Sequence, residues 1–211
     1  MESINQVLKV ARDLKHKANE KGDPKSKMIS YLLSGIEFFE AACLMLESSK
    51  KSSCSKAEAQ TFREKASRIF KETGNFYRQV SDMCHKSLEE INMTQPVDKK
   101  RVQSFTILLS SFYQLAAVCF FRRSRLCLSF RPKDVAKIRQ GIKDKSLADS
   151  GFKSAVRYFD ETCDFVTATF LLNSNDQIHF GDVERVNIHN VFEPSASEVR
   201  SFATTVTDKV Y

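Results

Sequence analysis

The sequence predicts an all-α protein built from antiparallel helix pairs, and three observations support this. Only six Gly and four Pro occur among 211 residues, so few positions interrupt a helix. Long segments carry apolar residues at spacings of three and four, the period of an α-helix buried along one face. The segments between them are short, which favours consecutive helices packed side by side. The chain is long enough to bury most of its apolar surface.

The first two helices are separated by a clear break. Apolar residues recur along one face of residues 3–20, and Gly22 ends this segment. Asp23 is a good N-cap for the next helix, and Pro24 suits its first turn, where no N–H is needed. Apolar side chains then cover nearly the whole circumference of residues 28–46. This second helix is therefore predicted at the centre of the fold.

Two long helices follow, over residues 55–92 and 97–128. The first has the cleanest apolar periodicity in the chain and tolerates Gly74 at some cost in stability. The second is apolar in its middle and basic at both ends, and Pro132 breaks the pattern after it. Their similar lengths favour packing against each other.

Capping boxes mark three predicted helix starts. In this motif a Ser and a Glu or Gln three residues later satisfy each other's backbone N–H groups. The three pairs are Ser3 with Gln6, Ser55 with Glu58, and Ser195 with Glu198. The last pair begins a final amphipathic helix with a narrow apolar stripe.

The C-terminal part is less regular. Shorter helices are predicted over residues 133–145 and 150–172, while residues 173–192 are compatible with an irregular segment, short strands or a frayed helix. We expect a helical domain over residues 1–173 and a tail over residues 174–211. The terminal helix of this tail packs on its own domain or on a second chain.

The six cysteines form no C-x-x-C pair, and most lie within helical apolar patterns, so buried free thiols in a reducing compartment are favoured over a disulfide framework. The sequence has no Gly-rich phosphate loop, no metal-ligand spacing and no nucleophile motif. We expect no catalytic residue, metal or cofactor, and a protein that is not an enzyme. The N-terminus lacks a signal core and no segment has the uncharged length of a membrane span, so a soluble protein without membrane contact is expected.

Positive charge is concentrated in one part of the chain. Between Lys99 and Lys145 there are twelve Lys or Arg residues and only two acids, a net charge of +10 in a protein of formal charge +7. Such a concentration attracts polyanions, and its contacts go to phosphate groups independently of sequence. Attraction of a partner chain and plain solubility remain alternatives. The predicted nucleic-acid contacts are Lys99, Lys100, Arg101, Arg122, Arg123, Arg125, Arg131, Lys133, Lys137, Arg139, Lys143 and Lys145.

The helices have more apolar surface than one small bundle needs, which predicts a dimer with two-fold symmetry. The interface is expected on the helices from residue 97 onward. Its predicted residues are Phe105, Phe112, Phe120, Val199, Phe202 and Val206.

Two runs of residues in the N-terminal segment form a recognisable pattern. The first consists of Ala11, Leu14, Lys15, His16 and Ala18, followed by Asn19. The second consists of Lys27, Tyr31, Phe38, Phe39 and Glu40. With these runs the segment resembles the C-terminal homology domain of the AFF/lilliputian family, the scaffold proteins of the super elongation complex, which usually has Asp in place of Asn19. The segment from Tyr113 to Arg125 is a weaker likeness, and the tail shares none.

The resemblance implies helix pairs arranged as in tetratricopeptide-type repeats. It further implies a dimerisation and scaffolding domain of a nuclear transcription-elongation regulator, with sequence-independent contact to DNA or RNA. The implied partners are a second copy or a related chain, and elongation-factor subunits bound through regions outside this chain. The alternative is a helical module that mainly binds nucleic acid or another polyanion and dimerises incidentally.

Overall fold

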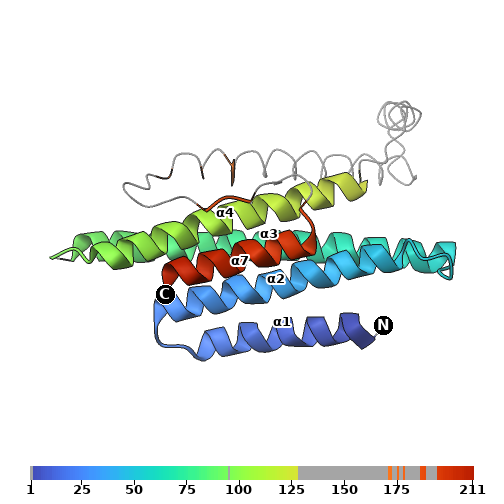
Figure 1. Cartoon of the computed structure of the whole chain (residues 1–211), viewed down its shortest axis with the longest axis horizontal. Helices are drawn as coiled ribbons and strands as arrows, with labels where there is room; N and C mark the ends of the chain where they lie inside the picture. The colour runs from blue at the N-terminus through green and yellow to red at the C-terminus, as the bar shows by residue number, and fades with distance from the viewer. Residues whose placement is uncertain are drawn as a thin grey trace, which may run out of the picture.

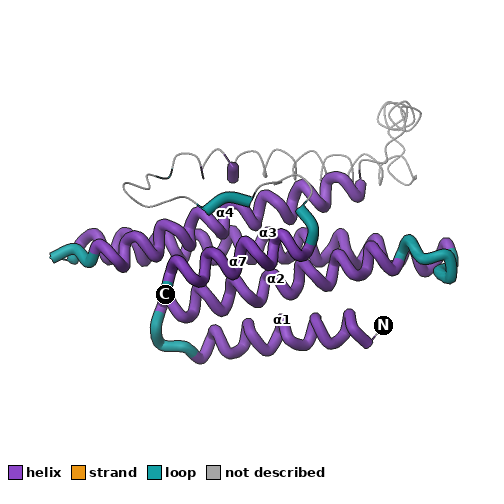
Figure 2. Tube along the Cα trace, viewed as in Figure 1, coloured by secondary structure: helices purple, strands orange, loops and turns teal. Residues whose placement is uncertain are grey.

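The structure is a computed structural model. It describes residues 2–94, 96–127, 171–172, 175, 178, 186–188 and 194–211. The described residues form five helices and no strand, which confirms the all-α class (Figure 2). The helices are α1 (Glu2–Glu20), α2 (Pro24–Ser48), α3 (Lys56–Met93), α4 (Lys99–Cys127) and α7 (Ala196–Val210).

The ends of these helices lie within a few residues of the predicted positions. Asp23 caps α2, and its Oδ2 accepts a hydrogen bond of 2.8 Å from the Ser26 N–H. The capping boxes at Ser55 and Ser195 are both formed. The box predicted at Ser3 is wrong, because α1 already begins at Glu2 and Ser3 lies inside the helix.

The predicted helices over residues 133–145 and 150–172 fall outside the described residues, apart from Leu171 and Leu172, which are helical. Most of the irregular segment predicted over residues 173–192 also falls outside them.

The first four helices run up and down, and α7 lies between α2 and α4 (Figure 1). Helix α2 packs against α1, α3 and α7, as expected for the central helix. Helices α3 and α4 share the most extensive contact in the described part of the chain. Helix α1 is on the outside, and among the described helices it packs against α2 alone.

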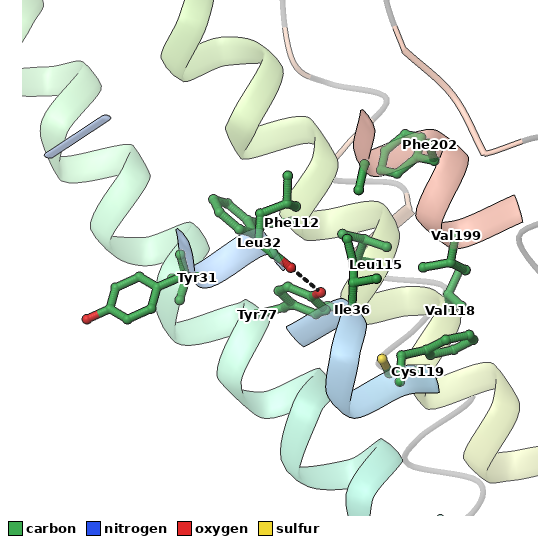
Figure 3. Packing of buried hydrophobic residues seen from close by; sticks show 14 of the residues in the cluster. Tyr31, Leu32, Ile36, Tyr77, Phe112, Leu115, Val118, Cys119, Val199 and Phe202 are labelled. Atoms are coloured by element: carbon green, nitrogen blue, oxygen red, sulfur yellow. Dashed lines mark hydrogen bonds between the residues drawn. The ribbon is translucent and has the colours of Figure 1, made fainter. Parts of the chain in front are cut away.

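The core forms where α2, α3, α4 and α7 face one another. Tyr77 of α3 is fully buried, and its hydroxyl donates a 3.0 Å hydrogen bond to the carbonyl of Leu32 in α2 (Figure 3). Phe39 of α2 packs edge-on against Phe70 of α3, with ring centroids 5.3 Å apart. Phe112 of α4 stacks on Tyr77 at 5.9 Å. Aromatic side chains thus join the three longest helices.

Two helices are long and apolar enough to cross a membrane by length and composition alone. They are α2 and the Lys99–Ser124 part of α4. This differs from the expectation that no segment reaches that apolarity. The most apolar stretch of α2 is 67% buried inside the chain, and that of α4 is 94% buried. Packing in the core therefore accounts for the apolar composition of both helices.

The six residues predicted at a dimer interface are core residues of a single chain. Phe105, Phe112, Phe120, Val199, Phe202 and Val206 are each at most 6% exposed. Val199 and Phe202 of α7 point toward α2 and α4 of the same chain (Figure 3). Side chains covered in this way leave no surface for a second chain. Of the two alternatives for the terminal helix, the structure has its apolar stripe packed on its own domain.

The segment before α7 is attached to α4 by one buried side chain. The Gln114 amide donates to the Val186 carbonyl and accepts from the Ile188 N–H, both at 2.9 Å. Nearby, the Ser110 hydroxyl donates to the Asn175 side chain at 2.6 Å. Because both backbone groups are satisfied by a side chain, residues 186–188 can lie against the core without joining a sheet.

Candidate nucleic-acid interface

A basic concave surface, hereafter the basic basin, lies where the N-termini of α2 and α4 meet the C-terminus of α7. It encloses about 660 Å³. The cations that line it are Lys25 of α2, Lys100 and Arg101 of α4, and Lys209 of α7. Asp23 and Asp98 also line it. Cations from three helices that are far apart in sequence therefore face one concavity.

The two carboxylates of the basin are engaged by the backbone. The Asp23 carboxylate caps α2, and hydrogen bonds from the Ser26 side chain and then its N–H lower the pKa of Asp23. Asp98 accepts a 3.1 Å hydrogen bond from the Arg101 N–H at the start of α4. Both acids therefore offset the positive end of a helix dipole, and the lining cations outnumber the two carboxylates.

Lys25 connects the basin to the end of α7. Its Nζ donates to the Val210 carbonyl at 3.4 Å and lies 5.4 Å from the centroid of the Tyr211 ring. The Ser104 hydroxyl donates to the same carbonyl at 3.3 Å. These contacts hold the C-terminal turn of α7 at the rim, and the Lys25 charge complements the negative end of that helix.

Lys100 and Arg101 are exposed, and neither forms an ion pair with any residue that the structure describes. Lys99, at the first position of α4, is exposed beside them. These three side chains are the predicted contacts that the structure places in a position to bind an external phosphate group. Arginine is suited to this because its planar fork matches two phosphate oxygens.

The basic residues at the other end of α4 occupy a different environment. Arg122 is half-buried, and its Nη2 donates a 2.6 Å hydrogen bond to the Pro194 carbonyl just before α7. Its charge opposes the rise in the pKa of Cys43 that burial causes. Arg123 is half-buried as well. Arg122 thus holds the start of α7, about 30 Å along α4 from the basin.

The remaining predicted contacts lie outside the description. Only the helical backbone of Arg125 is described, and nothing is described of Arg131, Lys133, Lys137, Arg139, Lys143 and Lys145. Sequence reasoning missed Lys25 and Lys209, which carry no local signal of a shared site. In the described parts of the chain, no group of three or more His, Cys, Asp or Glu side chains is placed to hold a metal ion.

Some of the residues that resemble the AFF/lilliputian pattern lie at the contact between α1 and α2. Ala11 and Ala18 are fully buried there, and the Ser34 hydroxyl donates to the Ala11 carbonyl at 2.7 Å. The Tyr31 hydroxyl donates to the Asn19 side chain at 2.6 Å. The motif therefore has a packing role in this fold. Comparison with known proteins gives no match to any family model, curated protein or solved structure.

Proposed function

We propose that this chain is a helical scaffolding domain that binds the phosphate backbone of nucleic acid in its basic basin. The observation that carries the proposal is the convergence of Lys25, Lys100, Arg101 and Lys209 from three helices. The concavity is within the size range of ligand sites in proteins, and its two acids serve as helix caps. Binding of this kind relies on counterion release and does not read base sequence.

The wider role rests on the resemblance of α1 and α2 to the AFF/lilliputian domain. On that resemblance we propose that the chain belongs to a nuclear regulator of transcription elongation, where a scaffold near nascent RNA or template DNA uses non-specific phosphate contact. Tetratricopeptide-like arrangement of the helix pairs belongs to the same proposal. Elongation-factor subunits would bind regions outside this chain.

Dimerisation with a second copy or a related chain also belongs to this proposal. Its interface must lie outside the apolar faces of α4 and α7, because those faces are buried in one chain. Light scattering across a range of protein concentrations tests whether the chain pairs.

Reversing the charge of Lys100 and Arg101 to Glu tests the nucleic-acid part of the proposal. We expect at least ~10-fold weaker binding to a random duplex and to single-stranded RNA at low salt. The slope of log affinity against log salt becomes shallower by about 2, since each lost phosphate contact contributes roughly 0.9. The fold is expected to persist, because acidic residues in the first turn of α4 favour its dipole. Fluorescence anisotropy over a salt series measures both quantities.

A matched control carries the same charge change on exposed residues of α3, Arg63→Glu with Lys65→Glu. These residues lie near the start of α3, whereas the basin lies beside the start of α4. Equal losses in the two variants would indicate attraction by the overall charge alone. Undiminished binding by the Lys100→Glu, Arg101→Glu variant would reject the basin as the binding surface.

A further inference from the structure

A second concave surface lies on the opposite side of α2 from the core helix α7. Helices α1 and α3 both pack on α2, and their backbones stay apart from each other while the Lys15 side chain of α1 reaches the Phe76 ring of α3. The space between them, hereafter the α1–α3 groove, encloses about 300 Å³. This is at the lower end of the range for small-molecule sites and suits a few side chains of a protein segment.

The floor of the α1–α3 groove is apolar. It is formed by Leu8 of α1, Phe38 of α2, and Ile69 and Phe76 of α3. All four side chains are half-buried, so each keeps apolar surface that an occupant can cover. Ile69 and Phe76 are two helical turns apart, about 10 Å, which matches the spacing of anchors along one face of a bound helix.

The two walls beside this floor carry charges of opposite sign, with cations on α1 and a carboxylate on α3. Arg12 and Lys15 stand exposed on the α1 wall, and neither pairs with a carboxylate of the described residues. The Lys15 Nζ lies 4.9 Å from the centroid of the Phe76 ring and so extends over the groove. Glu72 stands on the α3 wall. A uniformly charged phosphate backbone would meet repulsion from Glu72 and an apolar floor, whereas a carboxylate on a protein segment can face α1 alone.

We propose that the α1–α3 groove binds a short amphipathic helix of a partner protein. The apolar ridge of that helix covers Leu8, Ile69 and Phe76, and its acidic flank pairs with Arg12 and Lys15. Charge complementarity on the α1 wall selects the acidic partner, and the apolar floor selects an amphipathic one. This site is separate from the basic basin and does not depend on nucleic-acid binding.

The test uses the full chain and a fluorescein-labelled synthetic peptide of about 16 residues, ~24 Å long as a helix. The peptide carries leucines one turn apart on one face and glutamates beside them. Two control peptides replace the glutamates with lysines or the leucines with serines. We expect the glutamate peptide to bind about 10-fold more tightly than the lysine peptide, from two exposed ion pairs gained against two repulsions. The serine peptide should not bind.

The chain variant Arg12→Glu with Lys15→Glu should reverse this preference and favour the lysine peptide. Its melting temperature should stay unchanged, because both side chains are exposed. The Lys100→Glu, Arg101→Glu variant, with the same charge change in the basic basin, should bind the glutamate peptide as the unchanged chain does. NMR shifts of the Leu8, Ile69 and Thr73 amides should accompany binding.

Three results would overturn the proposal. The first is no binding of the glutamate peptide, or binding that the Arg12→Glu, Lys15→Glu variant leaves unaltered. The second is a dimer of the chain that the glutamate peptide dissociates in light scattering, which would make a second copy the occupant. The third is loss of nucleic-acid binding in the Arg12→Glu, Lys15→Glu variant, which would assign these cations to the phosphate-binding surface.

Discussion

At the scale of single residues, the contact between Gly35 and Tyr77 shows how closely α2 and α3 pack. A Cβ atom placed on Gly35 would lie 2.3 Å from Cζ of the Tyr77 ring and 2.4 Å from its hydroxyl oxygen. Burial raises the pKa of Tyr77 well above its ordinary value, so the hydroxyl stays protonated and donates to Leu32. The ring cannot swing away without leaving this buried group unsatisfied.

We predict that Gly35→Ala lowers the free energy of unfolding by about 3 kcal/mol. Alanine gains about 1 kcal/mol in helix propensity, but overpacking costs ~1–3 kcal/mol and the strained Tyr77 hydrogen bond a further ~1–3 kcal/mol. Urea denaturation measures the difference. Gly22→Ala is the control, because nothing lies within 4 Å of its Cβ position and its backbone is not left-handed. It should be neutral or stabilising by up to about 1 kcal/mol. Equal stability of Gly35→Ala and the unchanged chain would contradict this packing.

At the scale of a helix, two kinds of contact hold α7 in place. Its apolar stripe is buried, with Val199 and Val206 at 0% and Phe202 at 6% exposure. On its rim, Arg200 forms ion pairs with Glu37 of α2, at 2.9 Å, and with Glu40. Hydrogen bonds to Glu37 and then Glu40 raise the pKa of Arg200, so its charge is kept. Because Arg200 is half exposed, solvent screening limits what these pairs contribute.

We therefore predict that Phe202→Ala destabilises the chain by about 3–5 kcal/mol, whereas Arg200→Ala costs no more than about 1 kcal/mol. Thermal denaturation measures both. In Phe202→Ala, the rate of amide hydrogen exchange should rise most in α7. The mass of Phe202→Ala by light scattering should equal that of the unchanged chain, because Phe202 packs within one chain. A lower mass in solution for Phe202→Ala, at unchanged stability, would indicate that Phe202 lies at an interface between chains.

At the scale of the whole molecule, the cysteines report on the core. Cys43, Cys54, Cys84 and Cys119 are free thiols, as expected for the described part of the chain. Burial raises the pKa of Cys43 to about 11 and raises those of Cys84 and Cys119 still further. Cys54 lies half-buried in the loop between α2 and α3. The thiolate, which reacts, is therefore scarce at Cys43, Cys84 and Cys119.

We predict that a chain with Cys127 and Cys163 changed to Ser presents one reactive thiol to a disulfide reagent at neutral pH. Cys43 should react at least ~100-fold more slowly than a thiol with the ordinary pKa of 9.0, because a rise to about 11 lowers its thiolate fraction by that factor. All four thiols should react in urea. Rapid labelling of Cys84 or Cys119 in the folded chain would contradict the packing of α3 and α4.

The helix ends and the central position of α2 were predictable because their causes are local. Capping at Asp23, Ser55 and Ser195 needs only the next three residues, and the apolar circumference of α2 is visible in its own segment. The misplaced cap at Ser3 shows the limit of a spacing rule, since the helix there simply begins earlier.

The candidate site was only partly predictable. The concentration of charge at the start of α4 is visible in the sequence, but Lys25 and Lys209 join it only after α7 has packed between α2 and α4. Arg122 has the same local signal as Arg101, yet the fold turns it toward the Pro194 carbonyl. Local charge shows that a surface can attract phosphate, and tertiary packing decides which cations remain available.

The residues predicted at a dimer interface lie inside one chain for a related reason. The apolar stripes of α4 and α7 were correctly identified as buried faces. The periodicity of apolar residues shows that one face of a helix is buried from water. It does not show whether the surface that covers this face belongs to the same chain. In this fold α7 returns to cover α2 and α4 of its own chain, so Phe105, Phe112 and Val206 lie in one core. The partner of an apolar face is chosen by long-range packing, because burial depends on which surfaces the folded chain brings together.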